Sequence, residues 1–591
     1  MATATLLLLL VLCCSLAPAA LSVLPQPPVR CDRSGRCVLS NAYGAWSSDR
    51  EDCPVAAVAY PASERDVVAA VARASAGGLQ VKAVSGFAHT IPKLACPGGG
   101  LSDNGTLLIS TARYAGVEVD VAARTVTAEA GAPLRAVIDA AEASGLSLPA
   151  SPYWEGVSIG GAISTGSHGS SWWGRGGAVH DHVVGLTLVV PAGADHGWAR
   201  VVPLKKGDAL FPAALVSLGL LGVISKVTLS LEPRFKRSIT YDYRDDSTFQ
   251  DDFVDHAARH EFADITWYPS QHKAVYRMDD RAPLDATGDG VNDFIGFQST
   301  AIAVSAGIRA LETSLEKSRN VEGKCAMAKS EIAAKRLIGN GLRNSEHALL
   351  FTGYPVVGFQ GKMQTSGSCA HSPAYNLLAA CAWDPRHKGL FFYESTAVFS
   401  PARFRSFVLD VKRLRDIVGV DNMCGVDVYN GFLVRFVKKS EALLGQPEDS
   451  VVVDFNYYRA SDPSSARLDQ DVWEEVEQMA FVKHGARPHW AKNRMVAFRG
   501  VQGKYPGWTR FAEAKRQLDP RRLFDSPWSD EVMGEELGGV GGDDGCALDG
   551  QCVCSEDRHC SPAQGYYCGS GRVYTEARVC RYSASSSHLN V

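Results

Sequence analysis

Hydrophobic and polar positions along the chain follow two alternating patterns. Short apolar runs, typical of strands, alternate with amphipathic segments in which apolar residues recur every three or four positions, typical of helices. Helices are predicted over 63–78, 132–145 and 208–219, and the first has Ser63 as its N-cap and a Gly-Gly pair at its end. The pattern predicts an α+β domain over 50–235, with strands packed against a few helices.

A second block with the same alternation extends over 236–530. Several strand-like runs and two amphipathic helices, over 401–419 and 469–485, predict another α+β unit. The segment 531–545 is rich in glycine and acidic residues and reads as a linker. We therefore predict two domains, this linker, and a small tail over 546–591.

The N-terminus has the pattern of a secretory signal peptide. Leu6–Cys14 is an apolar run shorter than a membrane-spanning helix requires, and Ala17–Ala20 contains the small residues of a cleavage site. We predict a signal peptide over 1–20, a disulfide-rich lead-in over 21–49, and a secreted protein without a stable membrane span. Asn104, in Asn-Gly-Thr, is a predicted glycosylation site. The formal net charge of −4 gives no indication of a nucleic-acid partner.

Cysteine usage agrees with secretion. Two of the sixteen cysteines, Cys13 and Cys14, lie in the signal, and the remaining even number favours disulfides in an oxidising compartment. Six lie within Cys546–Cys580, where apolar residues are few, so we predict a disulfide-stapled tail. A zinc knuckle is the alternative, although the CxxC spacing is poor. The acidic loop Asp285–Asp293 lacks the closing Glu of an EF-hand, and no metal site is predicted.

The stretch Val157–Val190 is rich in glycine and hydroxyl side chains. Glycines let backbone N–H groups approach a ligand closely and hydroxyls add donors, which is the chemistry that a pyrophosphate needs. The spacing is neither GxGxxG nor GxxxxGK[ST], and a Gly/Ser surface loop is the alternative. The candidate ligand residues are Gly160, Gly161, Ser164, Thr165, Gly166, His168 and Gly169.

Two further motifs flank this stretch in a definite order. Ser85-Gly86…His89-Thr90 follows a predicted strand upstream, and Leu221-Gly222-Val223-Ile224 comes downstream. Together the three resemble the motifs of FAD-linked oxidases of the vanillyl-alcohol-oxidase type.

This resemblance implies a two-subdomain FAD-binding domain of the PCMH type. It implies that His89 carries a covalently linked flavin, with Ser85, Gly86 and Thr90 around it. His168 is then a flavin-phosphate or loop-stabilising group. The residues that would meet the adenine end are Gly222, Val223 and Ile224.

The second domain narrows the resemblance. Gly485–Arg494 contains His-Trp-Ala-Lys, and Phe524-Asp525-Ser526 follows a Leu-Asp-Pro sequence. Both are similar to the aldonolactone oxidase group, in particular to the secreted plant L-gulono-1,4-lactone oxidases. The resemblance implies a cap, or substrate, domain that oxidises this lactone towards ascorbate, through the 2-keto lactone, by hydride transfer to flavin N5. It also implies O₂ or another electron acceptor, with H₂O₂ as the product from O₂. Lys492 and His489 are the implied catalytic residues of this segment.

One position departs from the group's pattern. Its members carry Glu-x-Arg on a strand of the second domain; here Arg435 fills the arginine place and is the third catalytic candidate, but Leu433 fills the glutamate place. An arginine can hold an oxyanion or a lactone carbonyl without the acid. An oxidase or dehydrogenase of another sugar lactone or alcohol therefore stays open, as do a non-catalytic carbohydrate-binding protein and a structural wall protein. Tyr457, Tyr458 and Arg459 belong near this site or to strand packing.

Overall fold

The computed structural model describes most of both domains and of the tail. The described residues are 29–40, 52–86, 105–292, 310–339, 342–344, 349–351, 355–364, 392–427, 431–458, 466–492, 494–534, 544–548, 550 and 552–583. Several predictions fall outside this description: those on the signal peptide, His89, Thr90, Asn104, Arg459 and the side chains of Tyr457 and Tyr458.

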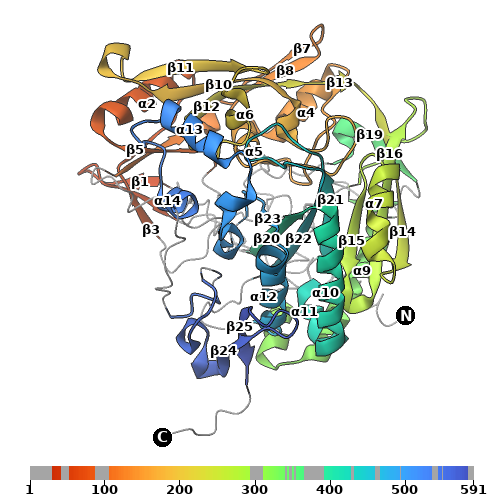
Figure 1. Cartoon of the computed structure of the whole chain (residues 1–591). Helices are drawn as coiled ribbons and strands as arrows, with labels where there is room; N and C mark the ends of the chain where they lie inside the picture. The colour runs from red at the N-terminus through yellow and green to blue at the C-terminus, as the bar shows by residue number, and fades with distance from the viewer. Residues whose placement is uncertain are drawn as a thin grey trace, which may run out of the picture.

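Two large sheets form most of the first domain, beside a two-stranded sheet of β9 (Leu146–Ser147) and β13 (Glu232–Pro233) (Figure 1). One is parallel, in the order β4-β6-β5, with strands β4 (Ala57–Ala59), β6 (Thr106–Ser110) and β5 (Gln80–Val84). The other is antiparallel, in the order β11-β10-β12-β8-β7, with strands β11 (Ala199–Lys205), β10 (Val183–Pro191), β12 (Val223–Ser230), β8 (Thr125–Glu129) and β7 (Val117–Asp120). The predicted α+β class is confirmed, because these sheets pack against helices.

Two of the three helices predicted here form as expected. Helix α2 (Glu64–Gly77) has Ser63 as N-cap, whose Oγ accepts the Asp66 N–H at 3.2 Å, and α4 (Leu134–Ala143) is the second. The third is wrong in length, since α6 spans only Phe211–Ala214. The predicted helix cannot reach Gly219, because Leu218 and Gly219 take positive φ values of 54° and 71°, which a right-handed helix cannot contain.

The second domain is built on one antiparallel sheet, in the order β19-β14-β16-β15-β21-β22-β20-β23. Its strands are β19 (Val356–Phe359), β14 (Lys236–Asp245), β16 (Lys273–Ala282), β15 (Asp264–Tyr268), β21 (Phe432–Val437), β22 (Ser450–Tyr458), β20 (Phe392–Phe399) and β23 (Arg487–Pro488). One face is apolar and packs on α7 (Phe249–Arg259), α10 (Pro401–Val418) and α12 (Gln470–Gln478). Because side chains alternate along a strand, the residues between these apolar positions lie on the opposite face, which meets the first domain.

After β23 the chain returns to the first domain. Helices α13 (Trp508–Leu518) and α14 (Pro527–Met533) contribute Phe511 and Trp528 to the same apolar cluster as α4 and α6, and Figure 1 shows α13 beside the first-domain helices. The boundaries near 235 and 530 remain sequence predictions. The segment that follows β23 therefore lies at the junction between the two domains.

The tail is a small disulfide-linked unit around β24 (Tyr566–Ser570) and β25 (Arg578–Tyr582). Its disulfides are Cys546–Cys552, Cys554–Cys568 and Cys560–Cys580. These bonds confirm the predicted stapling and occupy the sulfurs that a zinc knuckle would need. Elsewhere, Cys325–Cys424 joins α9 (Val321–Gly339) to α11 (Cys424–Asp427), and Cys31–Cys37 joins β1 (Val29–Cys31) to β2 (Cys37–Ser40).

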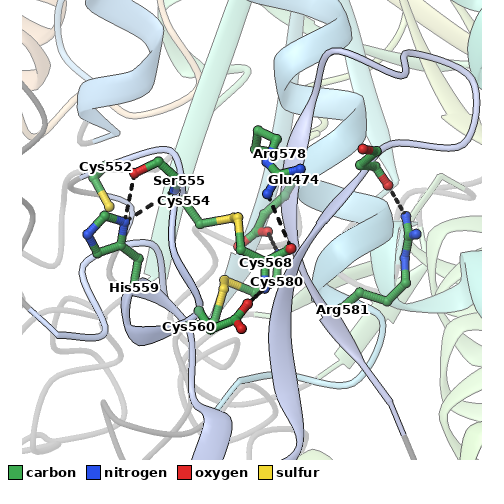
Figure 2. Close-up of a disulfide and its surroundings, with 12 residues drawn as sticks. Glu474, Cys552, Cys554, Ser555, His559, Cys560, Cys568, Arg578, Cys580 and Arg581 are labelled. Atoms are coloured by element: carbon green, nitrogen blue, oxygen red, sulfur yellow. Dashed lines mark hydrogen bonds between the residues drawn. A yellow bond between two sulfur atoms is a disulfide. The ribbon is translucent and has the colours of Figure 1, made fainter. Parts of the chain in front are cut away.

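Polar contacts hold the tail on α12. Figure 2 shows Glu474 of α12 beside Cys580, whose N–H donates to its carboxylate at 2.7 Å. The next residue, Glu475, is fully buried, and its carboxylate accepts the backbone N–H groups of the three consecutive residues 572–574 at 2.6–3.0 Å. Successive backbone N–H groups of this kind form a concave anion site. A carboxylate of α12 therefore fills, within one chain, a site built by the tail.

We expect Glu475→Gln to weaken this docking by about 2 kcal/mol, because the neutral amide loses charge-assisted hydrogen bonds and turns an N–H group towards N–H donors. Hydrogen exchange of residues 566–582 in the full chain measures the effect. Glu513→Gln, at an exposed position of α13, is the control. Unchanged protection of the tail in the Glu475 variant would show that this contact does not hold it.

Candidate functional site

The glycine-rich segment forms a short helix followed by a partly buried turn. Helix α5 (Ile159–Ser164) starts after Ser158, and its residues Ile159 and Ile163 lie in the core of the first domain. In the turn, Gly169 donates its N–H to the Gly177 carbonyl at 2.7 Å, and a Cβ added there would lie 2.5 Å from the Ser151 carbonyl oxygen. The segment is thus built into the domain and is not a surface loop.

The free donors of this segment fit a phosphate-bearing cofactor. Ser164 and Ser167 are half-buried, and neither hydroxyl bonds to a described residue. Gly161 is exposed, so backbone is accessible beside them. Thr165 departs from the expectation, because its Oγ1 donates to the Gly161 carbonyl of its own helix at 3.0 Å. His168 Nε2 is buried and has no partner among the described residues, which leaves it available to a bound group.

The glycine-rich segment and the downstream motif Leu221–Ile224 lie next to each other. Ala130 connects them, because its carbonyl accepts the Gly160 N–H at 2.9 Å and its own N–H donates to the Ser225 carbonyl of β12 at 2.9 Å. At the start of β12, Gly222 has φ 149°, and a Cβ there would lie 2.8 Å from the Val189 carbonyl oxygen, so only glycine fits. Val223 and Ile224 are buried behind it.

Of the upstream motif, Ser85-Gly86…His89-Thr90, the structure describes only Ser85 and Gly86. Ser85 and Gly86 follow β5, and the Ser85 carbonyl accepts the Ser110 Oγ–H at 2.9 Å. A Cβ at Gly86 would meet no described atom within 4 Å. The residues that follow, up to His89 and Thr90, lie outside the described part of the chain.

Two neutral histidines from opposite domains face each other. The ring centroids of His168 and His489 are 5.0 Å apart. Burial, with the charge of Arg435, lowers the pKa of His168 to about 3; burial, with His168 and Lys492 nearby, holds the pKa of His489 well below its ordinary value. His489 Nδ1 accepts the Ala491 N–H at 3.1 Å, so its proton is on Nε2, whereas His168 Nδ1 donates to the Gly169 carbonyl at 2.8 Å. The pair thus presents one donor and one acceptor nitrogen.

The His-Trp-Ala-Lys segment is anchored in both domains. The His489 N–H donates to the Thr396 carbonyl of β20 at 3.0 Å, and Trp490 packs in the core of the first domain. Further on, Arg494 is fully buried and pairs with Glu477 of α12 at 2.8 Å. These contacts hold the segment that carries Ala491 and Lys492 between the two domains.

The predicted catalytic residues come together. Arg435 of β21 donates through Nη1 to the His168 carbonyl at 3.1 Å and forms an ion pair with Asp454 of β22. Its Nε is buried and has no partner among the described residues. Lys492 forms an ion pair with Glu394 of β20. The site thus combines two cations and two imidazoles, and the Arg435 Nε–H has no partner among the described residues; the catalytic roles themselves stay predictions.

Sequence reasoning missed the acids and the phenol around Arg435. Tyr153, from the first domain, donates its hydroxyl to Asp264 of β15, and Arg277 Nη1 lies 3.0 Å from that hydroxyl. Burial, with the Asp264 charge, raises the pKa of Tyr153 well above its ordinary value, so the phenol stays protonated. The sequence did contain one signal for these acids: a single acidic residue inside an otherwise apolar strand, as at Asp454. A small polar cavity beside them is lined by Ser151, Tyr153, Ser170, Arg237, Arg277 and Gln364.

Family models match three parts of the chain. The FAD binding domain matches residues 55–194, D-arabinono-1,4-lactone oxidase matches 410–532, and the L-gulonolactone oxidase 2-like C-terminal domain matches 543–582. Among solved structures, a solvent-stable cholesterol oxidase aligns with a TM-score of 0.61 at 17% identity, over 82% of this chain and 96% of that one. At this identity the likeness shows the fold alone. No helix in the described part of the chain has the length and apolarity that crossing a membrane requires.

Relatives align over almost the whole chain. L-gulonolactone oxidase 3 of Arabidopsis thaliana is 58% identical over 95% of this chain and 95% of its own length. L-gulonolactone oxidase 5 of the same plant is 43% identical over 96% of each. An L-gulono-1,4-lactone dehydrogenase of Mycobacterium tuberculosis is 25% identical over 84% of this chain and all of its own. With an FAD-binding domain, an aldonolactone-oxidase region and this degree of identity, the chain belongs to the L-gulonolactone oxidase family.

Proposed function

We propose that this protein is an FAD-dependent oxidase that converts L-gulono-1,4-lactone, through the 2-keto lactone, to ascorbate. The observation that carries the proposal is the meeting of His168, His489, Arg435 and Lys492 at the junction of the FAD-binding domain and the large sheet. The L-gulonolactone oxidase names of the Arabidopsis relatives support the choice of lactone.

The residues present suit alcohol oxidation. When bound, FAD accepts a hydride from the carbon that carries the hydroxyl. The glycine-rich segment would hold the cofactor through Ser164, Ser167 and His168. Arg435, through its unpaired Nε–H, and Lys492 would stabilise the negative charge that develops on the substrate oxygens. His489, neutral and protonated on Nε2, would donate a hydrogen bond without adding charge.

Anaerobic reduction tests this function. The visible spectrum of the purified full-length protein should show flavin bands that bleach when L-gulono-1,4-lactone is added without oxygen. Admission of air should restore the colour and produce H₂O₂, as expected of an oxidase. A yellow protein that bleaches only with another lactone or alcohol would contradict the proposal that L-gulono-1,4-lactone is the substrate. A colourless protein that cannot be reconstituted with FAD would favour a binding or structural role.

We also propose that His89 carries the flavin covalently. The order of the motifs supports this, with Ser85-Gly86…His89-Thr90 upstream of the glycine-rich segment. His89→Ala should release the flavin into the supernatant on acid precipitation, whereas the unchanged protein should keep it in the pellet. His196→Ala, at an exposed position, is the control. Flavin retained in the pellet by the His89 variant would place the link elsewhere.

We also propose that O₂ is the electron acceptor and that the protein is secreted. The oxidase names of the plant relatives favour O₂ as electron acceptor, while the dehydrogenase name of the mycobacterial relative makes a dye or protein acceptor the alternative.

The predicted signal over 1–20, the predicted glycosylation site Asn104 and the disulfides of the tail support a secreted glycoprotein. A mature N-terminus near residue 21, together with a loss of mass on deglycosylation, is the expected result.

A further inference from the structure

Asp454 lies directly opposite the leucine that departs from the family pattern. In the antiparallel pairing of β21 with β22, Leu433 is the register partner of Asp454, and Arg435 is the partner of Val452. Residues directly opposite in such a pair point to the same face, with Cβ atoms about 5 Å apart. A carboxylate at 454 therefore stands one strand away from the place that Leu433 occupies, on the same face as Arg435.

The Asp454 side chain connects three elements of the site. One carboxylate oxygen forms an ion pair with Arg435, and the other accepts the hydroxyl of Thr396 on β20. The carbonyl of Thr396 in turn receives the His489 N–H at 3.0 Å. Asp454 thus joins the arginine of β21 to the strand that holds the predicted catalytic histidine.

The carboxylate stays ionised in this position. Burial alone would raise the pKa of Asp454, but the positive charges of Arg435 and Lys492 outweigh burial and hold the pKa below its ordinary value. Buried ion pairs are a poor way to stabilise a sheet, because desolvation offsets most of their attraction. The pair holds one end of the guanidinium while Nε stays unpaired among the described residues, an arrangement that suits orientation towards a ligand.

We propose that Asp454 replaces, from the neighbouring strand, the carboxylate that Leu433 cannot provide, and that it is the positioning residue that orients Arg435 towards the lactone. The inference rests on the proposed function and extends it. Because both oxygens of Asp454 are engaged, the acid orients the arginine and does not itself bind sugar hydroxyls. Leu433 presents an apolar surface where the family pattern has an acceptor.

Asp454→Asn should lower kcat per bound flavin about a hundredfold, as expected when a reacting group is misplaced by about 1 Å, with a smaller change in KM. The matched control is Asp246→Asn. Asp246 is as buried and pairs with Arg415 at 2.7 Å, away from the site. This control should lower thermal stability and leave kcat per flavin unchanged. Equal kcat values for the Asp454 variant and the unchanged enzyme would overturn the inference.

A relocation experiment completes the test and does not depend on the stability of the single variant. Leu433→Glu combined with Asp454→Asn keeps the charge of the site and moves the carboxylate to the position of the family pattern. This double variant should recover at least a tenth of the original kcat. A folded, yellow double variant that is no more active than Asp454→Asn would contradict the proposal that a carboxylate at 454 takes the place of one at 433. If the unchanged enzyme itself does not oxidise the lactone, the proposed function fails, and the variants are then compared on the substrate that bleaches the flavin.

Discussion

Replacing Arg435 by alanine should lower kcat/KM for the lactone about a hundred- to a thousandfold, the usual effect of removing one donor to a developing oxyanion. The guanidinium is buried, bonded to Asp454 and to the His168 carbonyl, and its Nε is unpaired among the described residues. Arg435→Lys should recover little, because an ammonium cannot reproduce the planar fork that makes these contacts together. Turnover per bound flavin is the measurement, and Arg259→Ala, at an exposed position, is the control.

The same change should also destabilise the protein, by about 3–5 kcal/mol, because Asp454 is left buried and unpaired. Arg435→Ala combined with Asp454→Asn separates the two effects. The double variant should regain most of the stability and none of the turnover. Recovery of turnover along with stability would mean that Arg435 acts only on the fold.

The second large effect is expected for Lys492→Met, which keeps the length of the side chain and removes its charge. We expect kcat to fall about a hundredfold, because the site loses one of its two positive groups near the reacting oxygens. Stability should fall less than in the Arg435 variant, since the Glu394 side chain is 22% exposed and water can partly solvate the remaining carboxylate, whereas Asp454 is buried.

Lys439→Met, at an exposed position after β21, is the matched control and should leave kcat unchanged. A small primary amine added to the Lys492 variant should restore part of the rate if the missing charge is the cause. Full activity of the Lys492 variant without added amine would remove this residue from the reaction.

Local chemistry made several elements predictable. Helix α2 follows from the cap at Ser63 and the left-handed Gly78, since both act within one turn of chain. The disulfide-stapled tail follows from six cysteines in a segment too poor in apolar residues for a core. The cofactor motifs could be read because they consist of glycines and hydroxyls close together in sequence. The length of α6 could not, because a tertiary turn at Leu218 and Gly219 overrides helix propensity.

The sequence alone thus determined the fold class, the stapled tail, the cofactor motifs and the residues Lys492, His489 and Arg435. Only the tertiary structure decided how they meet. Asp454 pairs with Arg435 because of the register of two strands, in which Leu433 lies opposite Asp454, and register depends on which faces of a sheet are buried. His168 faces His489 because the chain crosses back to the first domain after β23. Contacts between distant segments arise from packing of the whole fold, which no local pattern specifies.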